Sequence, residues 1–490
     1  MPPIAFLLAA TVTTATAQTT NGPCEALKAA AFDHTTIASA AMTPADAAAG
    51  TPAFCEVTAT ISPVPGSNIG VVYRLPENWN GKMVGLGGGG WAGSVLLARA
   101  MPGLKQGYAT AQTDAGHPIP TDAADIWRPD KWGTPETFAD FQYRAIHEMT
   151  TLAKAVVAKY YGKPHAKAYF HGCSTGGRQG LIEVQRYPDD YDGVVSMAPV
   201  YGLTVQTSSA VRTNTLGKAG AALTPEIMSR VNAAVLASCD AQDGLADGLL
   251  EDPRRCSWDP AELLCKADQS GNACLTQPQV DALRTLYTGV KTSDGRVVAW
   301  PLARGDESSW RIALSGPASD TSNAGGLGAL TGPVFGDPNF NLATFDPATH
   351  YDTVAKSAFA KAYEANDPNI AMFTKRGGKL LLWHGWGDSG PSPWLTIDYY
   401  ERVLKTTPTM ASSVRLFLAP NVGHCAGGRG PDQFDALTAI DTWVTTGTAP
   451  DVLLATKAKP PMTRPLCAYP KVAKYKGRGD VNDASSFACR

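Results

Sequence analysis

A serine, an aspartate and a histidine stand in motifs that suit nucleophilic catalysis. Ser174 lies in Gly172-Cys-Ser-Thr-Gly176, a G-x-S-x-G sequence. Alternating apolar residues precede it, as in a strand, and the amphipathic segment 181–186 after it is typical of a helix. In this setting the motif predicts a nucleophile elbow, a strained turn whose neighbours must be small. The alternative is a glycine-rich strand-to-helix loop without a catalytic role.

Two later segments supply an acid and a base in the chain order Ser, Asp, His. Asp388 follows the strand-like run 377–383, and His424 lies in a loop after the strand-like run 414–418. These are the positions at which the acid and the base of this kind of triad belong. We therefore predict Ser174 as nucleophile, His424 as base and Asp388 as the residue that orients the base.

Other residues compete for these roles. Asp398 is the alternative acid, but it lies on an expected helix, 397–404, and faces away from a site at the strand ends. His384 is an alternative base. His117 is another, although a single histidine in a turn is more often structural.

An oxyanion would need N–H donors close to the serine. The expected helix after the elbow directs the N–H of Thr175 at the site. A glycine-rich loop, 87–93, follows the strand-like run 82–86, and such a loop supplies the second donor, from Gly88 or Gly89. The alternative is a flexible hairpin with no such role.

Composition excludes several kinds of partner and cofactor. The 490 residues are 44% apolar and 18% charged, with a net charge of −2 and no basic run, so we expect neither nucleic acid nor an anionic membrane as partner. No later apolar run approaches the roughly 18–20 residues of a membrane span. No Walker sequence is present, and no nucleotide cofactor is expected.

The N-terminus has features of an export signal. Residues 4–10 form a short apolar core, and Ala15-Thr-Ala17 is an A-x-A cleavage site, which predicts a signal peptide over residues 1–17 and a secreted protein. The first residues lack the Lys or Arg that such signals carry. A disordered N-terminus is the alternative.

Ten cysteines, an even number, favour disulfides in an exported protein. Four pairs lie close in sequence: Cys24 and Cys55, Cys239 and Cys256, Cys265 and Cys274, and Cys467 and Cys489. Cys173 and Cys425 remain, each beside a candidate catalytic residue, and a bridge between them would clamp nucleophile and base together. Zinc is the alternative for such clusters, but C-x-x-C spacing is absent.

The order of expected elements indicates an α/β fold. Strand-like runs at 70–75, 82–86, 108–113 and 192–199, with a long helix over 138–161, predict a mainly parallel sheet with helices on both faces. From about residue 201 such runs vanish until 379. We predict an α/β-hydrolase core, formed by residues 18–200 and 371–490, with an inserted lid domain over 201–370.

The expected lid contains an acidic, glycine-rich segment. Asp240, Asp243 and Asp247 at short spacing offer oxygen ligands for a hard cation, to which Leu245 and Leu249 would add backbone carbonyls. The spacing is not that of an EF-hand. An acidic, solvated loop is the alternative.

Aromatic residues of the lid are candidates for a substrate pocket or for its core. They are Trp300, Trp310 and Phe335, and His384 beside Asp388 is a further candidate for the pocket wall. Arg311 would meet a substrate carboxylate or form a surface ion pair.

These motifs together resemble those of the tannase and feruloyl esterase family. The matching segments are 171–180, 384–388, 423–425, 464–470 and 486–489, and the similarity covers most of residues 20–490. The resemblance implies the Ser174–His424–Asp388 triad, a Cys173–Cys425 bridge, a lid that carries the substrate pocket, and a structural Ca²⁺ held by Asp240, Asp243, Asp247 and the carbonyls of Leu245 and Leu249. The four local cysteine pairs also fit the family.

The expected activity is that of a secreted serine carboxylesterase acting on a small aromatic ester or a feruloylated polysaccharide. Galloyl esters and terephthalate monoesters are the alternative substrates. A peptidase would share the triad. A non-catalytic, calcium-stabilised extracellular binding protein is a remote alternative, because all three triad candidates are retained.

Overall fold

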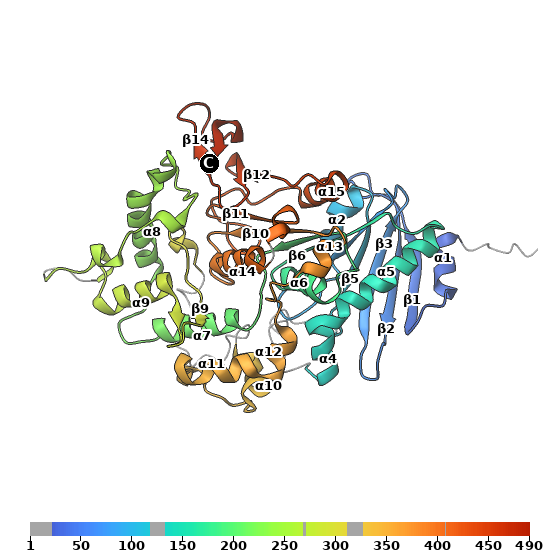
Figure 1. The fold of residues 1–490 in the computed structure, drawn as a ribbon, viewed down its shortest axis with the longest axis horizontal. Helices are drawn as coiled ribbons and strands as arrows, with labels where there is room; N and C mark the ends of the chain where they lie inside the picture. The colour runs from blue at the N-terminus through green and yellow to red at the C-terminus, as the bar shows by residue number, and fades with distance from the viewer. Residues whose placement is uncertain (1–21, 118–132, 268–270, 311–326, 407) are drawn as a thin grey trace, which may run out of the picture.

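A nine-stranded sheet forms the centre of the protein in the computed structural model, which describes residues 22–117, 133–267, 271–310, 327–406 and 408–490 (Figure 1). The strands lie in the order β1-β2-β3-β5-β4-β6-β7-β10-β11. Their bounds are β1 Thr35–Thr43, β2 Phe54–Ile61, β3 Ile69–Pro76, β4 Lys82–Leu86, β5 Ala109–Thr113, β6 Lys167–Cys173, β7 Gly193–Met197, β10 Lys379–Gly385 and β11 Val414–Ala419. The expected signal peptide, 1–17, and Arg311 lie outside the described residues.

The sheet is parallel from β5 through β4, β6, β7 and β10 to β11. At the N-terminal edge, β1, β2, β3 and β5 pair antiparallel. The predicted mainly parallel sheet is therefore confirmed, and an antiparallel edge extends it. The carboxyl ends of the parallel strands share one edge of the sheet, where loops can carry a site.

Helices cover both faces of the parallel part. α5 (Ala145–Tyr161), α6 (Thr175–Arg186) and α14 (Pro393–Thr406) pack on one face, and α2 (Leu97–Lys105) and α15 (Ala436–Thr446) pack on the other. Successive residues of a strand point to opposite faces, so Leu380 and Leu382 join the first apolar cluster, and Leu381 and Trp383 join the second. Burial on both faces explains why these strands are apolar throughout.

The long helix expected over 138–161 begins earlier and contains a wide turn. α4 (Pro135–Ala139) leads through a π-helical segment, Asp140–Arg144, directly into α5. Such π-bulges accommodate an extra residue within an α-helix.

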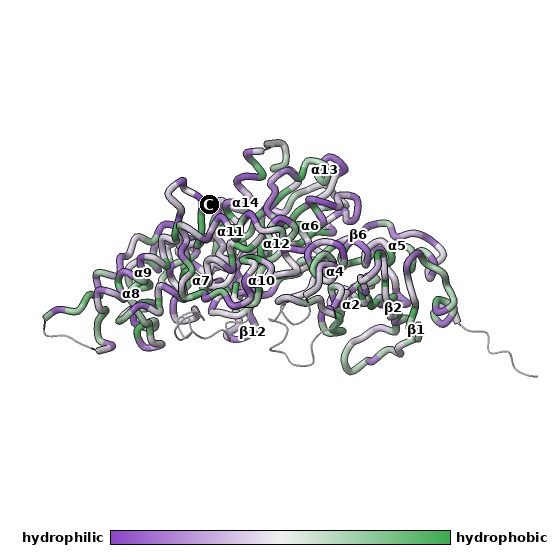
Figure 2. Tube along the Cα trace, turned by 90° about the horizontal axis from the view of Figure 1, so that it is seen from below, coloured by the Kyte–Doolittle hydropathy of each residue, from purple (hydrophilic) through white to green (hydrophobic). Residues whose placement is uncertain are grey.

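The segment 201–370 is mainly helical. It contains α7 Thr204–Leu216, α8 Pro225–Cys239, α9 Gln277–Thr288, α10 Thr331–Phe335, α11 Pro347–Lys356, α12 Ala358–Tyr363 and a short hairpin, β8 Val290–Lys291 with β9 Val297–Ala299. Side chains between Leu216 and Trp310 form an apolar cluster of their own. α8 and α9 lie at the end of the elongated molecule opposite β1 and β2 (Figures 1 and 2).

The C-terminal segment adds two small hairpins. They are β12 Val452–Ala458 with β13 Pro461–Cys467, and β14 Ala473–Tyr475 with β15 Phe487–Cys489. Among the helices in the described ranges, none has the length and apolar composition needed to cross a bilayer.

Candidate active site

Ser174 occupies a strained turn between the central strand β6 and α6. Its φ of +63° and ψ of −123° lie in a region that non-glycine residues rarely adopt. A Cβ on Gly172 would lie 2.5 Å from backbone atoms of Gly176, so the turn closes only with glycine there. The turn is held by the Ser174 N–H, which donates to the carbonyl of Met197 at 3.0 Å. This geometry is that of a nucleophile elbow.

His424 and Asp388 complete a hydrogen-bonded chain with this serine. His424 Nε2 lies 2.8 Å from Ser174 Oγ, and His424 Nδ1 lies 2.7 Å from Asp388 Oδ2. With Asp388 ionised, Nδ1 carries the proton and donates to the carboxylate, while Nε2 accepts from the serine hydroxyl. The structure thus brings Ser174 to a histidine that lies 250 positions later in the chain, in the arrangement that activates a serine.

Asp388 is fully buried and remains a carboxylate. Burial alone would raise its pKa, but the charges and hydrogen bonds of His424 and His384 outweigh burial and hold the pKa well below its ordinary value. The N–H of Gly390 donates to the second carboxylate oxygen at 2.8 Å. The acid is therefore held in place from several sides.

His384 lies behind Asp388 and is completely buried. Its Nε2 is 3.1 Å from Asp388 Oδ2 and 3.0 Å from the carbonyl of Pro391, and its Nδ1 is 2.7 Å from Thr396 Oγ1. Both ring nitrogens are thus occupied away from Ser174. This geometry corrects two expectations for His384, as an alternative base and as a wall of an open pocket.

The other alternative residues have different surroundings. Asp398 pairs with Arg402 at 2.8 Å on the outer side of α14. His117 is buried, and its ring faces Phe141 with the centroids 6.2 Å apart. Neither takes part in the hydrogen-bonded chain of Ser174.

All ten cysteines form disulfides in the predicted pairs. They are Cys24–Cys55, Cys173–Cys425, Cys239–Cys256, Cys265–Cys274 and Cys467–Cys489. The Cys173–Cys425 bridge connects the elbow directly to the loop of His424.

The glycine-rich loop packs against the elbow, as an oxyanion loop must. A Cβ on Gly176 would lie 2.9 Å from the carbonyl of Gly88, and the hydroxyl of Thr175 donates to the carbonyl of Gly90. The N–H of Gly88 donates to Gln179 Oε1 at 2.9 Å, and the N–H of Gly89 donates to the carbonyl of Ala92 at 3.1 Å. The N–H of either glycine would therefore have to give up or share its present hydrogen bond in order to donate to an oxyanion.

Sequence reasoning did not identify Gln179 as part of this region. Gln179 lies four residues after Thr175, on the same face of α6, so helical spacing places it near the N-terminal turn. The four-residue spacing from Thr175 could therefore have identified Gln179 from the sequence.

Sequence reasoning also missed two residues that connect the segment 201–370 to the triad loops. Arg212 of α7 donates to the carbonyls of Ser389 at 2.7 Å and Trp300 at 2.8 Å. Burial lowers the pKa of Arg212 to about 10, against the opposing charge of Asp388. Asn421, three residues before His424, accepts from the N–H of Leu250 at 2.9 Å and donates to the carbonyl of Gly305 at 2.6 Å. Nothing in their local sequence signals these distant partners.

The aromatic pocket candidates separate into different environments. Trp310 is buried in the core of the helical segment, with its ring centroid 5.7 Å from that of Tyr287, which corrects its expected place in a pocket wall. Phe335 stacks on Phe340 at 4.0 Å. Trp300 is half-buried, and its contact with Arg212 places it beside the Asp388 loop.

The acidic loop formed by residues 240–249 has oxygen donors that suit a hard cation. One oxygen of Asp240 is buried without a hydrogen-bond partner, and Asp247 pairs with Arg464 at 2.7 Å. Burial raises the pKa of Asp243 to about 6, and the neighbouring charges of Asp247 and Asp240 add to the effect. In the described residues, no three carboxylates of this loop converge within 4.8 Å. A cation here would therefore also need backbone carbonyls, as expected of Leu245 and Leu249.

The fold is that of an α/β-hydrolase. Helices flank a parallel sheet, the serine elbow follows a central strand, and the Asp and the His lie on loops at the ends of later strands. The chain belongs to the tannase and feruloyl esterase family, because residues 55–490 match the family model described as "Tannase and feruloyl esterase". The protein is accordingly a carboxylic ester hydrolase.

Individual relatives agree with this assignment. The chain is 33% identical to a mono(2-hydroxyethyl) terephthalate hydrolase of Piscinibacter sakaiensis, over 90% of this chain and 85% of that protein. It is also 33% identical to a "Probable feruloyl esterase" of Arthroderma benhamiae, over 89% and 85%. Feruloyl esterase B from Aspergillus oryzae superposes with a TM-score of 0.84 at 28% identity, covering 96% of this chain and 99% of that one.

Proposed function

We propose that this protein cleaves esters of aromatic acids through a Ser174–His424–Asp388 triad and a covalent acyl-enzyme. The observation that carries the proposal is the continuous hydrogen-bonded chain from a strained serine through a histidine to a buried, ionised aspartate. Family membership supports ester hydrolysis as the reaction of this chain.

The geometry supports a two-stage reaction. Ser174 Oγ attacks the ester carbonyl while His424 Nε2 takes the hydroxyl proton, and Asp388 stabilises the imidazolium that forms. The imidazolium then protonates the leaving alcohol. In the second stage His424 deprotonates a water, which attacks the acyl-enzyme and releases the acid. N–H groups of Thr175 and of the Gly88–Gly89 region would stabilise the oxyanion, and each such donor is worth about 3 kcal/mol.

The acyl group is proposed to be aromatic, with hydroxycinnamates on plant polysaccharide preferred. Relatives named as feruloyl esterases and as a terephthalate monoester hydrolase support an aromatic acid in the substrate. Galloyl esters and terephthalate monoesters are the alternatives within the same mechanism.

Hydrolysis of a small substrate panel tests the proposal. The panel contains methyl ferulate, methyl p-coumarate, methyl gallate and mono(2-hydroxyethyl) terephthalate, with Ser174→Ala as the control. We expect turnover of at least one member and a preference for a hydroxycinnamate. Cleavage of only short aliphatic esters would retain the serine mechanism but contradict the aromatic acyl group.

The same panel, extended by the matching amides, separates the other classes. A non-catalytic, calcium-stabilised binding protein would cleave none of these esters, and wild type and Ser174→Ala would be indistinguishable. A peptidase would prefer the matching amides.

We further propose that the acidic loop binds a structural Ca²⁺ and that the protein is exported. Asp240, Asp243 and Asp247 would hold the ion with the carbonyls of Leu245 and Leu249. The buried, unpartnered oxygen of Asp240 supports a cation there. Five disulfides support an oxidising compartment outside the cytoplasm.

A further inference from the structure

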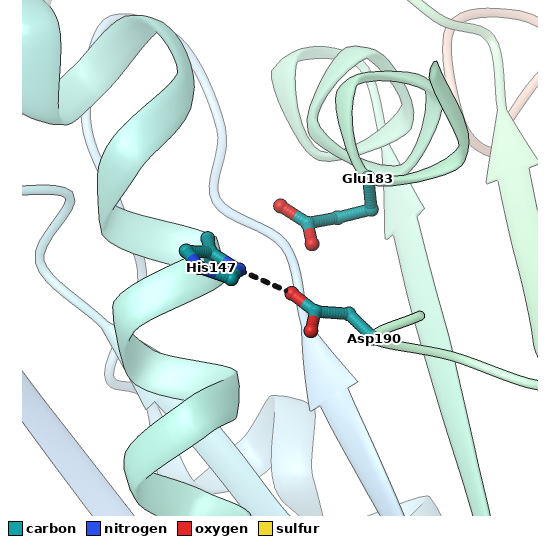
Figure 3. A group of neighbouring side chains, drawn as sticks. All are labelled: His147, Glu183 and Asp190. Atoms are coloured by element: carbon teal, nitrogen blue, oxygen red, sulfur yellow. Dashed lines mark hydrogen bonds and ion pairs between the residues drawn. The ribbon is translucent and has the colours of Figure 1, made fainter. Parts of the chain in front are cut away.

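Three titratable side chains meet at a place that the proposed reaction does not use. His147 comes from α5, Glu183 from α6, and Asp190 from the turn between α6 and β7 (Figure 3). One possible ligand atom of each lies within 4.8 Å of those of the other two. Within the described ranges of the chain, these are the only three His, Cys, Asp or Glu residues that gather so closely.

Glu183 is the unusual member of this group. Glu183 is 1% exposed, and neither of its carboxylate oxygens accepts from an N–H or a hydroxyl donor, although the carboxyl group of Asp190 lies close enough to share a proton with it. Figure 3 shows the carboxylate turned toward the space shared with His147 and Asp190. A buried carboxylate without a donor is costly unless a cation or a proton neutralises it. Burial and, to a lesser extent, the charge of Asp190 accordingly raise the pKa of Glu183.

The neighbouring basic side chains contact Asp190 rather than Glu183. His147 Nδ1 lies 2.7 Å from Asp190 Oδ2, and Lys154 Nζ lies 3.5 Å from the other oxygen of Asp190. Lys154, and His147 when it is protonated, compensate the charge of Asp190, so Glu183 has no cation in direct contact. His147 stacks on Tyr187 with centroids 4.0 Å apart, and its side chain is 34% exposed, so an ion would have a route from solvent.

We propose that His147, Glu183 and Asp190 form a binding site for a divalent transition-metal cation, for which Zn²⁺ is the probe. One imidazole nitrogen and two carboxylates are a donor set that suits Zn²⁺, with water completing the coordination. Mutual separations within 4.8 Å allow one ion to reach all three atoms with bonds of about 2.0–2.2 Å after small side-chain adjustments. Ca²⁺ fits less well because it takes about six to eight oxygen ligands.

Binding requires a change of tautomer at His147. The Nδ1 position must be free of its proton to coordinate the ion, so the neutral imidazole carries the proton on Nε2. The metal replaces the present contact between Nδ1 and Asp190. An ion bound in this way would connect α5 to the helix that follows Ser174, as a structural link. Glu183 lies nine residues after Ser174, about 13 Å along the helix, too far for direct contact with the reacting ester.

Titration of the metal-free, full-length protein with ZnSO4 tests the site. Saturating CaCl2 keeps the acidic loop occupied, and the readouts are calorimetry, thermal unfolding and the visible absorption of bound Co²⁺. We expect one site of micromolar or tighter Kd and a rise in Tm on binding. Glu183→Gln and His147→Gln should each weaken binding at least tenfold and lose the Tm response.

His34→Asn is the matched control, because His34 is exposed, lies outside the cluster, and has a φ of +53° that asparagine tolerates. It should bind Zn²⁺ like wild type. Because His147 is partly exposed, its variant remains informative even where the buried Glu183→Gln fails to fold. Absence of Zn²⁺ binding in wild type would overturn the proposal and favour a protonated Glu183 that shares its proton with Asp190. Undiminished binding in His147→Gln would also overturn it, since the ion would then lie elsewhere.

Discussion

Cys173 and Cys425 are joined by a disulfide with Cα atoms 6.0 Å apart, although 252 positions separate them in the chain. Cys173 directly precedes Ser174, and Cys425 directly follows His424. The 2.8 Å contact between His424 and Ser174 is therefore backed by a covalent link between the two loops. We infer that the bridge fixes the base relative to the nucleophile, which is the positioning that nucleophilic catalysis requires.

Replacing both cysteines of this bridge by serine should lower kcat about ten- to a hundredfold, because small misplacements of a catalytic group have effects of this size. The free energy of unfolding should fall by about 2–5 kcal/mol. Steady-state kinetics and thermal unfolding check both effects. The double replacement of Cys265 and Cys274 is the control, since that bridge closes a separation of 9 within the helical segment and should leave kcat unchanged. Equal kcat losses in both variants would contradict a special role for Cys173–Cys425.

Asp388→Asn should reduce kcat by up to about four orders of magnitude, because the neutral amide neither fixes the His424 tautomer nor stabilises its protonated form. In wild type, the pKa of Asp388 is held below its usual range, so this group stays ionised from about pH 4 upward. The acid side of the pH profile of kcat/KM should thus show one ionisation, with the rate falling as pH falls and the base becomes protonated. A second acid-side ionisation above pH 4 that disappears in Asp388→Asn would contradict a permanently ionised Asp388.

The same lowered pKa has a consequence for stability. A carboxylate with a depressed folded-state pKa contributes stability above its unfolded pKa of about 3.9 and loses it as pH falls through the folded value. The difference in unfolding free energy between wild type and Asp388→Asn should therefore shrink as the pH is lowered below about 4. Denaturant unfolding at several pH values measures this difference in free energy. A difference that grows toward acid pH would contradict a depressed pKa of Asp388 in the folded state.

Arg212→Lys should loosen the loop that carries Asp388. A single ammonium group cannot reproduce the guanidinium contacts with the carbonyls of Ser389, Gly390 and Trp300. We expect kcat to fall about tenfold or more and the unfolding free energy to fall by roughly 2 kcal/mol. Arg284→Lys, at an exposed ion pair with Asp259, is the matched control and should change neither quantity. Unchanged kcat and unchanged unfolding free energy in Arg212→Lys would show that the loop does not depend on this residue.

Removal of Ca²⁺ with a chelator should lower Tm, and CaCl2 should restore it, because a ligand that binds only the folded state stabilises that state. The double variant Asp240→Asn and Asp243→Asn should lose this response, and it leaves the Asp247–Arg464 ion pair intact. A chelator response that persists unchanged in the double variant would place the ion at another site.

The elbow, the acid and the base could be predicted because each depends on local sequence. Ser174 is marked by the small residues that its turn requires, and Asp388 and His424 follow recognisable strands in a characteristic order. The parallel strands were apparent for the same reason, since burial on both faces makes them apolar throughout.

Other parts of the site depend on packing between distant segments. Arg212 resembles any helical arginine until α7 is placed against the Ser389–Gly390 turn. Trp310 and Trp300 have the same residue type, yet one packs into a core and the other lies beside the Asp388 loop. His384 appears catalytic from its sequence neighbours, but burial behind Asp388 makes it a partner of the acid. Glu183 gave no sequence signal, because its partners come from α5 and from a separate turn.

Covalent labelling tests whether Ser174 is the nucleophile. The protein is treated with a fluorophosphonate, and intact-mass and peptide mass spectrometry locate the adduct. We expect one adduct per chain, on Ser174, with a parallel loss of ester hydrolysis and no labelling in Ser174→Ala. Full hydrolysis by a chain labelled elsewhere, or equal labelling of Ser174→Ala, would contradict a serine nucleophile at this position.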